Sequence, residues 1–160
     1  MTAVLLVAGV VLALDQATKA VALVRLVDGL PVSLIDGVLA LTLVLNPGLA
    51  FGLLAELPRA WRWVIMALSL GALVMLARVA VRLLTPGSPL DRLAVGLIFG
   101  GAVGNLIDRI RFGAVVDFID VYYRDWHWPA FNVADSAITV GVGMLALRLL
   151  TRPASRPASP

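Results

Sequence analysis

The stretch over residues 90–107 reads LDRLAVGLIFGGAVGNLI. Beyond its first three residues it carries no charge, and its length approaches the about 20 predominantly apolar residues that cross the hydrocarbon core of a bilayer. Gly96, Gly100 and Gly104 recur at every fourth position, so they lie near one another on a helix surface and allow a neighbouring helix to approach closely. This stretch therefore predicts a transmembrane helix that packs inside a helical bundle.

Three more apolar stretches of similar length lie on either side of this one, at residues 3–25, 61–84 and 133–150. The composition agrees, because 61% of the 160 residues are hydrophobic, 14% are charged and the mean hydropathy is +0.97. These values exclude an ordinary soluble domain and predict a mainly α membrane protein with four transmembrane helices and both termini on one side. The first stretch lacks the basic start and the cleavage site of a secretory signal, so we expect it to remain in the mature chain.

The residue types of the chain limit the chemistry that it can perform. The chain contains no cysteine and one histidine, His127, which excludes disulfides, thiol nucleophiles and a zinc centre of histidines or thiolates. We therefore expect no metal and no cofactor, and any catalysis falls to carboxylates or to Lys19. The net charge is +3, but the arginines form no dense cluster, so we expect no nucleic-acid partner.

Residues 28–58 differ in character from the apolar stretches that flank them. Asp28-Gly29 and Asp36-Gly37 are turn signals, and residues 38–45, VLALTLVL, are typical of a β-strand. This pattern predicts a small sheet within residues 28–58. Because an open sheet edge in lipid leaves backbone groups unpaired, we expect the sheet at the membrane surface, on the side opposite the termini.

The distribution of charges and aromatic residues indicates how the chain is organised. We expect one membrane-embedded domain over residues 1–151 and a disordered tail over residues 152–160, where RPAS occurs twice. Aromatic residues gather between residues 112 and 131, which favours anchoring at one membrane face or a platform that docks lipids. Asp91 is the only acid among the cations on the side of the termini; this favours cytoplasmic termini, although the count of cations alone does not decide.

Two polar residues interrupt the first apolar stretch. Asp15 and Lys19 are four positions apart, so they share one face of a helix, with the acid first. A charge inside a membrane helix costs about 2.5 to 3.5 kcal/mol on insertion scales, and a partner must offset that cost. The pair is either a self-neutralising structural pair or a pair that orders an adjoining loop or sheet.

Amide side chains occur at two further places. Asn46, followed by Pro47 and Gly48, is either part of an ordinary turn or presents its amide to an extended peptide. Asn105 lies beside the glycine face of its helix and needs polar partners there, and Arg109 follows one turn later. Together Asn105 and Arg109 can hold a substrate carbonyl or steady a carboxylate.

Two carboxylates from different segments are predicted at the same membrane face. Asp117 follows the third apolar stretch and Asp135 opens the fourth. Close together in a partly dry setting they share one proton, so that one acts as general base on water while the other donates to a carbonyl oxygen, as in peptide hydrolysis. The alternative is helix capping, with Asn132 as the N-cap residue and Asp135 three residues on.

In this order the motifs resemble those of the lipoprotein signal peptidases, the bacterial signal peptidase II family of membrane aspartyl proteases. The resemblance covers residues 10 to 150. Its specific parts are Asp15-Gln16 with Thr18-Lys19, Asn46 with Gly48 and Ala50-Phe51-Gly52, Gly104-Asn105 with Asp108-Arg109, Val116-Asp117-Phe118, and Phe131-Asn132 with Ala134-Asp135. Pro47 and Leu49 depart from the pattern, which bears on the local shape of the loop.

The resemblance implies an endopeptidase that removes the signal peptide from prolipoproteins, immediately before a cysteine that carries a diacylglyceryl group. It implies that Asp117 and Asp135 form the catalytic dyad. The polar positions that it implies as substrate-binding or supporting are Asn46, Gly48, Asn105, Arg109, Asn132, Asp15 and Lys19.

The resemblance also implies a setting and partners. The fold has four transmembrane helices, a small extracytoplasmic β-cradle and an interfacial helix over the site, which matches Phe118 to Trp128 here. The protein resides in the bacterial inner membrane with its site near the outer face, contacts membrane lipids and is blocked by the cyclic peptide antibiotic globomycin. We expect a monomer.

Three other functions compete with this interpretation. A small ion or proton translocator would use Asp15, Lys19 and Asp108 as a relay through the membrane. A Ser-Lys protease would pair Lys19 with Ser33 or Ser136. A structural or assembly protein would show no turnover.

Overall fold

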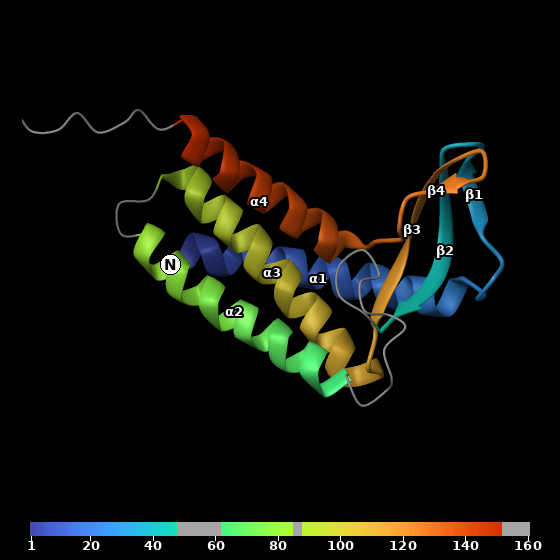
Figure 1. The fold of residues 1–160 in the computed structure, drawn as a ribbon, viewed down its shortest axis with the longest axis horizontal. Coiled ribbons are helices and arrows are strands. Elements are labelled where there is room, and N and C mark those ends of the chain that lie inside the picture. The colour runs from blue at the N-terminus through green and yellow to red at the C-terminus, as the bar shows by residue number, and fades with distance from the viewer. Residues whose placement is uncertain (48–61, 85–87, 152–160) are drawn as a thin grey trace, which may run out of the picture.

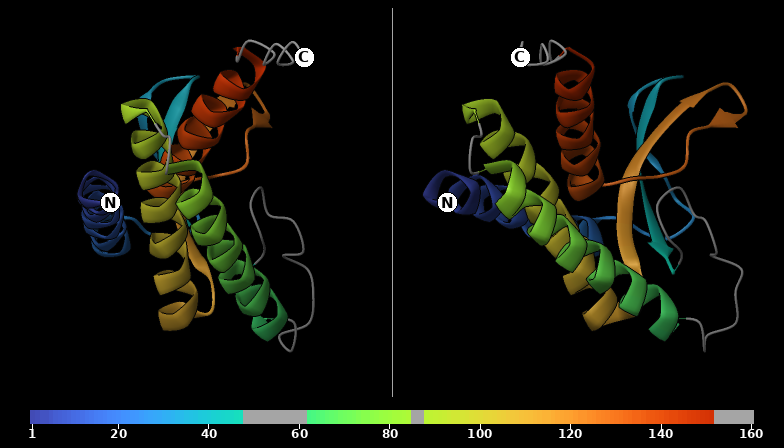
Figure 2. Two further views of the ribbon diagram at one scale, coloured as in Figure 1. Left: turned by 90° about the vertical axis from the view of Figure 1, so that its left-hand side faces the viewer. Right: turned by 60° about the vertical axis from the view of Figure 1, so that its left-hand side comes forward.

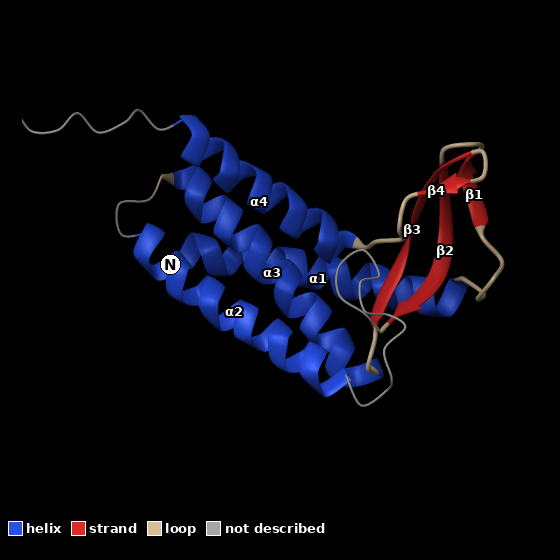
Figure 3. Ribbon diagram, viewed as in Figure 1, coloured by secondary structure: helices blue, strands red, loops and turns tan. Residues whose placement is uncertain are grey.

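The computed structural model describes residues 1–47, 62–84 and 88–151. Four helices form a bundle, and four strands form one antiparallel sheet at the end of the bundle away from the start of the first helix and the end of the last (Figure 1). Figure 3 separates the two parts by colour. The elements in chain order are α1 (Thr2–Arg25), β1 (Val32–Ile35), β2 (Leu39–Asn46), α2 (Arg62–Leu84), α3 (Pro89–Phe112), β3 (Val115–Tyr123), β4 (Trp126–His127) and α4 (Val133–Thr151).

All four predicted apolar stretches are helices, with ends close to the predicted ones. Within the described parts of the chain, α1 and α3 have the length and hydropathy of helices that cross a membrane. The prediction placed the end of α3 at residue 107, but the helix continues to Phe112 and ends at Gly113, whose φ of 68° closes it. Asp108 and Arg109 therefore belong to α3. The prediction ended the helix before them because they are charged, but charged residues do not end a helix.

Helix α3 is central to the bundle, because it packs against α1, α2 and α4. A Cβ atom added to Gly96 would lie 2.7 Å from Val7 Cβ, and one added to Gly100 would lie 2.7 Å from the carbonyl oxygen of Ala8. Both contacts are with α1, so the predicted close approach of a neighbouring helix is confirmed. Figure 2 shows the bundle from two further sides.

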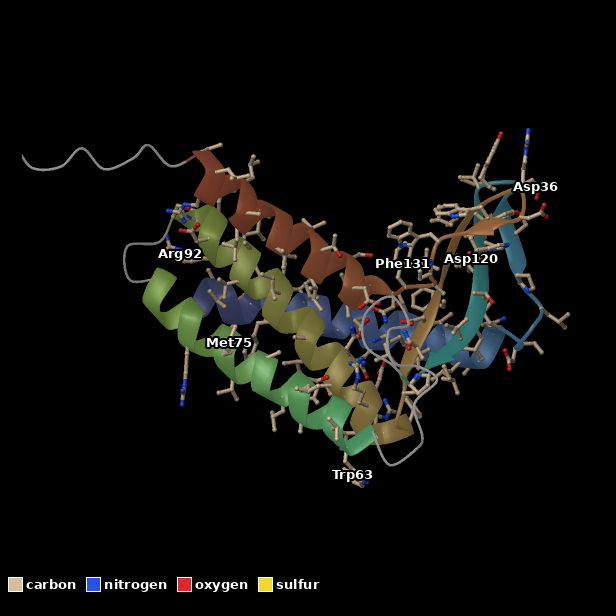
Figure 4. The ribbon with its side chains drawn as sticks, viewed as in Figure 1. Asp36, Trp63, Met75, Arg92, Asp120 and Phe131 are labelled. Atoms are coloured by element: carbon tan, nitrogen blue, oxygen red, sulfur yellow. The ribbon has the colours of Figure 1, made fainter. Side chains whose placement is uncertain are left out.

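An ion pair joins α3 to α4 at the end of the bundle away from the sheet. Asp91 is almost fully buried and pairs with Arg148 of α4. The same carboxylate accepts the backbone N–H of Ser88, and the Ser88 hydroxyl accepts the N–H of Asp91, which completes a capping box at the start of α3. Arg92 marks this end in Figure 4.

The sheet has the order β1-β2-β3-β4. The predicted turns at Gly29 and Gly37 are confirmed, since both residues have positive φ, and the predicted strand over residues 38–45 is β2. β2 pairs with β3 from Leu39 opposite Val121 to Asn46 opposite Val115. The predicted small sheet is therefore present at the expected end of the bundle; the rest of its predicted range, residues 48–58, lies outside the described residues, as do Gly48 and the predicted disordered tail 152–160.

The predicted interfacial helix over residues 118–128 is wrong. These residues form the greater part of β3 and all of β4. The segment 115–123, VVDFIDVYY, is rich in β-branched and aromatic residues, which favour a pleated strand over a helix. On one edge of β3 the backbone N–H and C=O groups pair with β2. On the other edge, the backbone of Phe131 forms hydrogen bonds with Phe118 and Ile119.

Candidate active site

Asp117 and Asp135 both contact the side chain or backbone of one buried residue, Asn132. Asp117 lies in β3, and its Oδ1 accepts a hydrogen bond of 2.7 Å from Asn132 Nδ2. Asp135 lies in the first turn of α4, and its Oδ2 accepts the backbone N–H of Asn132 at 3.3 Å. Strand β3 and the first turn of α4 thus bring the two predicted carboxylates to the same residue, Asn132.

Asn132 and Asp135 also cap α4. The N–H of Asp135 donates to Asn132 Oδ1 at 2.9 Å, which together with the reverse hydrogen bond forms a capping box. Asn132 is fully buried. The capping interpretation is therefore confirmed, and Asn132 caps the helix while it also donates a hydrogen bond to Asp117.

Two more amide side chains donate to the carboxylates. Asn46, at the end of β2, donates through Nδ2 to Asp117 Oδ2 at 3.0 Å. Asn105, in α3, donates through Nδ2 to Asp135 Oδ1 at 2.8 Å. Each aspartate thus accepts a hydrogen bond from the side chain of at least one neutral amide, which holds its orientation.

The surroundings of Asp117 disfavour its charge. Burial raises the pKa of Asp117 to about 7, although the hydrogen bonds from Asn46 and Asn132 and the charge of Lys19 act to lower this pKa. The negative charge of Asp135 raises the pKa of Asp117 further. A carboxyl group with this pKa changes its protonation near neutral pH, which suits proton transfer to or from a reacting group.

Lys19 is buried beside the site with three acceptors. Its Nζ lies 2.9 Å from Asp15 Oδ2 and 2.7 Å from Asp108 Oδ2. It also donates to Asn105 Oδ1 at 2.9 Å, which turns the Asn105 amide nitrogen toward Asp135. The shared helix face of Asp15 and Lys19 is confirmed, and the pair extends to α3 rather than neutralising only itself.

Asp108 and Gln16 belong to the motifs that carry the resemblance, and Asp108 to the relay considered for a translocator, but neither was predicted as a substrate-binding or supporting residue. Asp108 Oδ2 accepts the backbone N–H of Val116 at 3.2 Å, next to Asp117. Gln16 Nε2 donates to Asp108 Oδ1 at 3.0 Å and to Asp15 Oδ2 at 3.2 Å. The signal for Asp108 was present, because it continues the spacing of four that places the preceding glycines against α1.

One acid of the cluster, Asp15, also holds the start of α4. Asp15 Oδ1 accepts the backbone N–H of Ala134 at 3.0 Å, one residue before Asp135. A carboxylate at a helix N-terminus is stabilised by the unpaired N–H groups there. Gly104 of α3 faces the same carboxylate, and a Cβ atom on Gly104 would collide with Asp15 Oδ2.

Arg109 lies at the edge of the site and is half-buried. Its Nη1 donates to the carbonyl oxygen of Asn105 at 3.3 Å, and its charge interacts with those of Asp135 and Asp117. Among the described residues, no group of three or more histidine or acidic side chains is placed to hold a metal ion.

The hydroxyl groups considered for a Ser-Lys protease have other partners. Ser136 Oγ donates to the carbonyl oxygen of Asn132, and Ser33 Oγ donates to Asp36 Oδ1. The partners of Lys19 are the oxygens of Asp15, Asp108 and Asn105.

Comparison with known proteins identifies the family. Residues 7–151 match the family described as signal peptidase (SPase) II. The lipoprotein signal peptidase of Syntrophotalea carbinolica is 50% identical over 145 residues, which cover 89% of this chain and 88% of that protein. The lipoprotein signal peptidase of Geobacter sulfurreducens is 48% identical over 142 residues, covering 87% of this chain and 86% of that protein.

A solved structure has the same fold. A bacterial membrane enzyme, determined by the in meso method at 2.3 Å resolution, superimposes with a TM-score of 0.78 at 30% sequence identity. The match covers 100% of this chain and 94% of that chain. The chain therefore belongs to the signal peptidase II family of membrane peptidases.

Proposed function

We propose that this chain is an aspartic endopeptidase that cleaves the signal peptide from prolipoproteins, immediately before the diacylglyceryl-modified cysteine. The observation that carries the proposal is the placement of Asp117 and Asp135 around Asn132, with the pKa of Asp117 raised to about 7. Two carboxylates in such a place hold one proton between them more readily than two negative charges. The relatives named lipoprotein signal peptidase supply the substrate class.

The reaction needs one water and the shared proton. The ionised aspartate removes a proton from the water as the water oxygen attacks the scissile carbonyl carbon, and the protonated aspartate donates its proton to the carbonyl oxygen. Collapse of the tetrahedral intermediate breaks the C–N bond, and the first aspartate gives its proton to the leaving amine. The second aspartate takes a proton back from a hydroxyl group of the intermediate, so the pair again holds one proton. The proton belongs to the pair, so neither role is assigned to one residue alone.

Polar groups around the dyad are suited to hold the peptide. Asn46, Asn105 and Asn132 orient the carboxylates, and Asp15 with Lys19 supports Asn105 and the start of α4. Arg109 can donate to a carbonyl oxygen of the bound peptide, because guanidinium groups present several donors. Globomycin, a cyclic peptide that resembles the substrate, is proposed to occupy this site.

The setting proposed for the enzyme is the bacterial inner membrane. Four helices cross it, the termini lie in the cytoplasm, and the dyad lies near the outer face at the sheet end of the bundle. There the acyl chains of the substrate remain in hydrocarbon while water reaches the scissile bond. The enzyme acts as a monomer of one domain, residues 1–151, and the hydrolysis is proposed to proceed without a metal or cofactor.

A translocator accounts less well for the buried charges. Asp15, Lys19 and Asp108 contact each other, and through Asn105, Val116 and Ala134 they contact the immediate surroundings of the dyad. A relay through the membrane needs groups spaced along its depth. Groups gathered at one end favour a surface hydrolase.

The decisive experiment compares two precursors. The purified protein in detergent is incubated with a diacylglyceryl-modified prolipoprotein and with the same precursor unmodified, and cleavage is followed by mass spectrometry. We expect cleavage of the modified precursor alone, at the bond before the cysteine, and a loss of at least about a thousandfold in Asp117→Asn and Asp135→Asn, as for essential catalytic groups. Retained cleavage in either variant would overturn the assignment.

A further inference from the structure

A second cluster of polar and aromatic side chains lies in the hairpin of β3 and β4, outside the site described above. His127 Nδ1 lies 3.0 Å from Asp120 Oδ1 and 2.9 Å from Asp120 Oδ2. Because a carboxylate only accepts hydrogen bonds, Nδ1 carries a proton in this contact. Asp120 is nearly buried, with 12% of its side chain exposed, whereas the His127 side chain is 55% exposed.

Tyr122 connects this pair to the turn between β1 and β2. Its ring stacks on the His127 ring, with centroids 5.3 Å apart and planes inclined by 12°. Its hydroxyl oxygen accepts the N–H of Gly37 at 3.0 Å, and its own N–H donates to Val38 at 2.9 Å. The hairpin is thus attached to the neighbouring turn by side chains as well as by strand pairing. Asp120, labelled in Figure 4, lies three residues after Asp117 and so projects from the opposite face of β3.

The β3–β4 hairpin sets the direction of the segment that follows it, residues 128–132. β4 pairs with β3 through only two residue pairs, and the turn between them carries Arg124 at a positive φ of 54°, which is unfavourable for a residue with a side chain. The pairing between β3 and β4 themselves is therefore short. The contact between the side chains of Asp120 and His127 links the two strands and helps to fix the register of this short pairing.

The segment after β4 runs back along β3 to the site. The N–H of Trp128 donates to Val121 O at 2.8 Å, and the N–H of Phe131 donates to Ile119 O at 3.1 Å. The next residue is Asn132, which donates to Asp117 Oδ1 and caps the helix that carries Asp135. A shift of His127 along β3 would therefore move Asn132 relative to both aspartates.

We propose that Asp120 and His127 are positioning residues, which clasp the β3–β4 hairpin and so hold Asn132 in register with Asp117 and Asp135. We call the contact between Asp120 and His127 the clasp. Its expected effect on turnover rests on the proposed function, whereas its expected effect on the backbone does not depend on any substrate. It acts through Asn132 and does not touch the scissile bond.

The test uses deletion and conservative variants of both residues in the full chain. Asp120→Ala and His127→Ala remove the contact. Asp120→Asn keeps an acceptor, and His127→Asn keeps a donor nitrogen at the place of Nδ1. Asp125→Ala is the matched control, because it removes an exposed acid from the same hairpin turn.

Hydrogen–deuterium exchange is measured first, without substrate. In Asp120→Ala and His127→Ala we expect the amides of Trp128 and Phe131 to exchange faster by about tenfold, while the amides inside α3 are unchanged. The two conservative variants are expected to restore most of the protection, and Asp125→Ala to resemble the unmodified protein. Unchanged exchange in both alanine variants would overturn the proposal, even if the chain cleaves no prolipoprotein.

Kinetics then separates positioning from folding and from binding. A small misplacement of reacting groups lowers turnover strongly, so we expect kcat to fall about tenfold or more in both alanine variants, with KM changed less than about twofold. The conservative variants should recover kcat. A fall confined to KM, or an equal fall in Asp125→Ala, would contradict the clasp, whereas failure of the unmodified chain to cleave would refute the proposed function and leave the exchange result standing.

Discussion

Replacing Asp117 by asparagine is expected to abolish cleavage and yet to stabilise the protein at alkaline pH. The pKa of Asp117 rises from 3.8 in an unperturbed aspartate to about 7 in the folded chain, so folding opposes ionisation of this group. One pKa unit corresponds to about 1.4 kcal/mol, so the shift costs about 4 kcal/mol of folding free energy once Asp117 is ionised. Asparagine carries no charge and escapes this cost, but it loses one hydrogen bond to Asn46 or Asn132, worth about 1 kcal/mol.

The sign of the effect changes with pH. Because the folded pKa lies above the unfolded pKa, the folded chain binds more protons between about pH 4 and pH 7, and the stability of the unmodified protein falls as pH rises through this range. Asp117→Asn should therefore be about 3 kcal/mol more stable than the unmodified protein at pH 8. At pH 4, where Asp117 is neutral in the folded chain, the variant should be no more stable than the unmodified protein.

Unfolding in detergent micelles, followed by tryptophan fluorescence, measures this difference at pH 4, 6 and 8. Asp125→Asn is the control, because it makes the same replacement at an exposed aspartate in the hairpin turn. A difference between Asp117→Asn and the unmodified protein that stays flat across the three pH values would refute the reasoning from burial, as would a less stable variant at pH 8.

Three further predictions address other parts of the structure. Asn46→Ala removes a hydrogen bond that lowers the pKa of Asp117, so the alkaline limb of the kcat profile should move to higher pH, measured between pH 5 and 9.5. Lys19→Met leaves two buried carboxylates without their cation and should cost about 3–5 kcal/mol in the same unfolding assay, partly restored by adding Asp108→Asn. Gly100→Ala places a Cβ 2.7 Å from Ala8 O and should destabilise by about 1–3 kcal/mol, whereas an alanine at Gly143, which has open space, should not.

The helices and the capping of α4 were predictable because their signals are local. Runs of apolar residues predict helices, and Asn132 with Asp135 three residues later predicts a helix start. The spacing of Gly96 and Gly100 predicts a close neighbour without identifying it as α1. Such features depend on residues within one or two turns of the chain.

The third and fourth strands were not predicted, because their partners are distant in sequence. β3 pairs with β2, whose residues lie 69 to 82 positions earlier, and this pairing decides that a segment with many aromatic residues becomes a strand rather than an interfacial helix. The role of Asp108 depends in the same way on Lys19 of α1, which is distant in sequence although the two side chains are in contact. A single sequence gives no measure of such long-range pairings.

The buried charges explain why the aspartate pair keeps a proton. Asp15 and Asp108 are both fully buried with Lys19, and the charge of Arg109 interacts with those of Asp135, Asp117 and Asp108. Two ionised carboxylates in the pair would repel each other, and burial raises the cost of ionising both further. Lys19 offsets part of this cost at Asp117, whereas burial and the charge of Asp135 act against ionisation there. The balance favours one negative charge and one proton on the pair, which is the state that hydrolysis by a general base and a general acid requires.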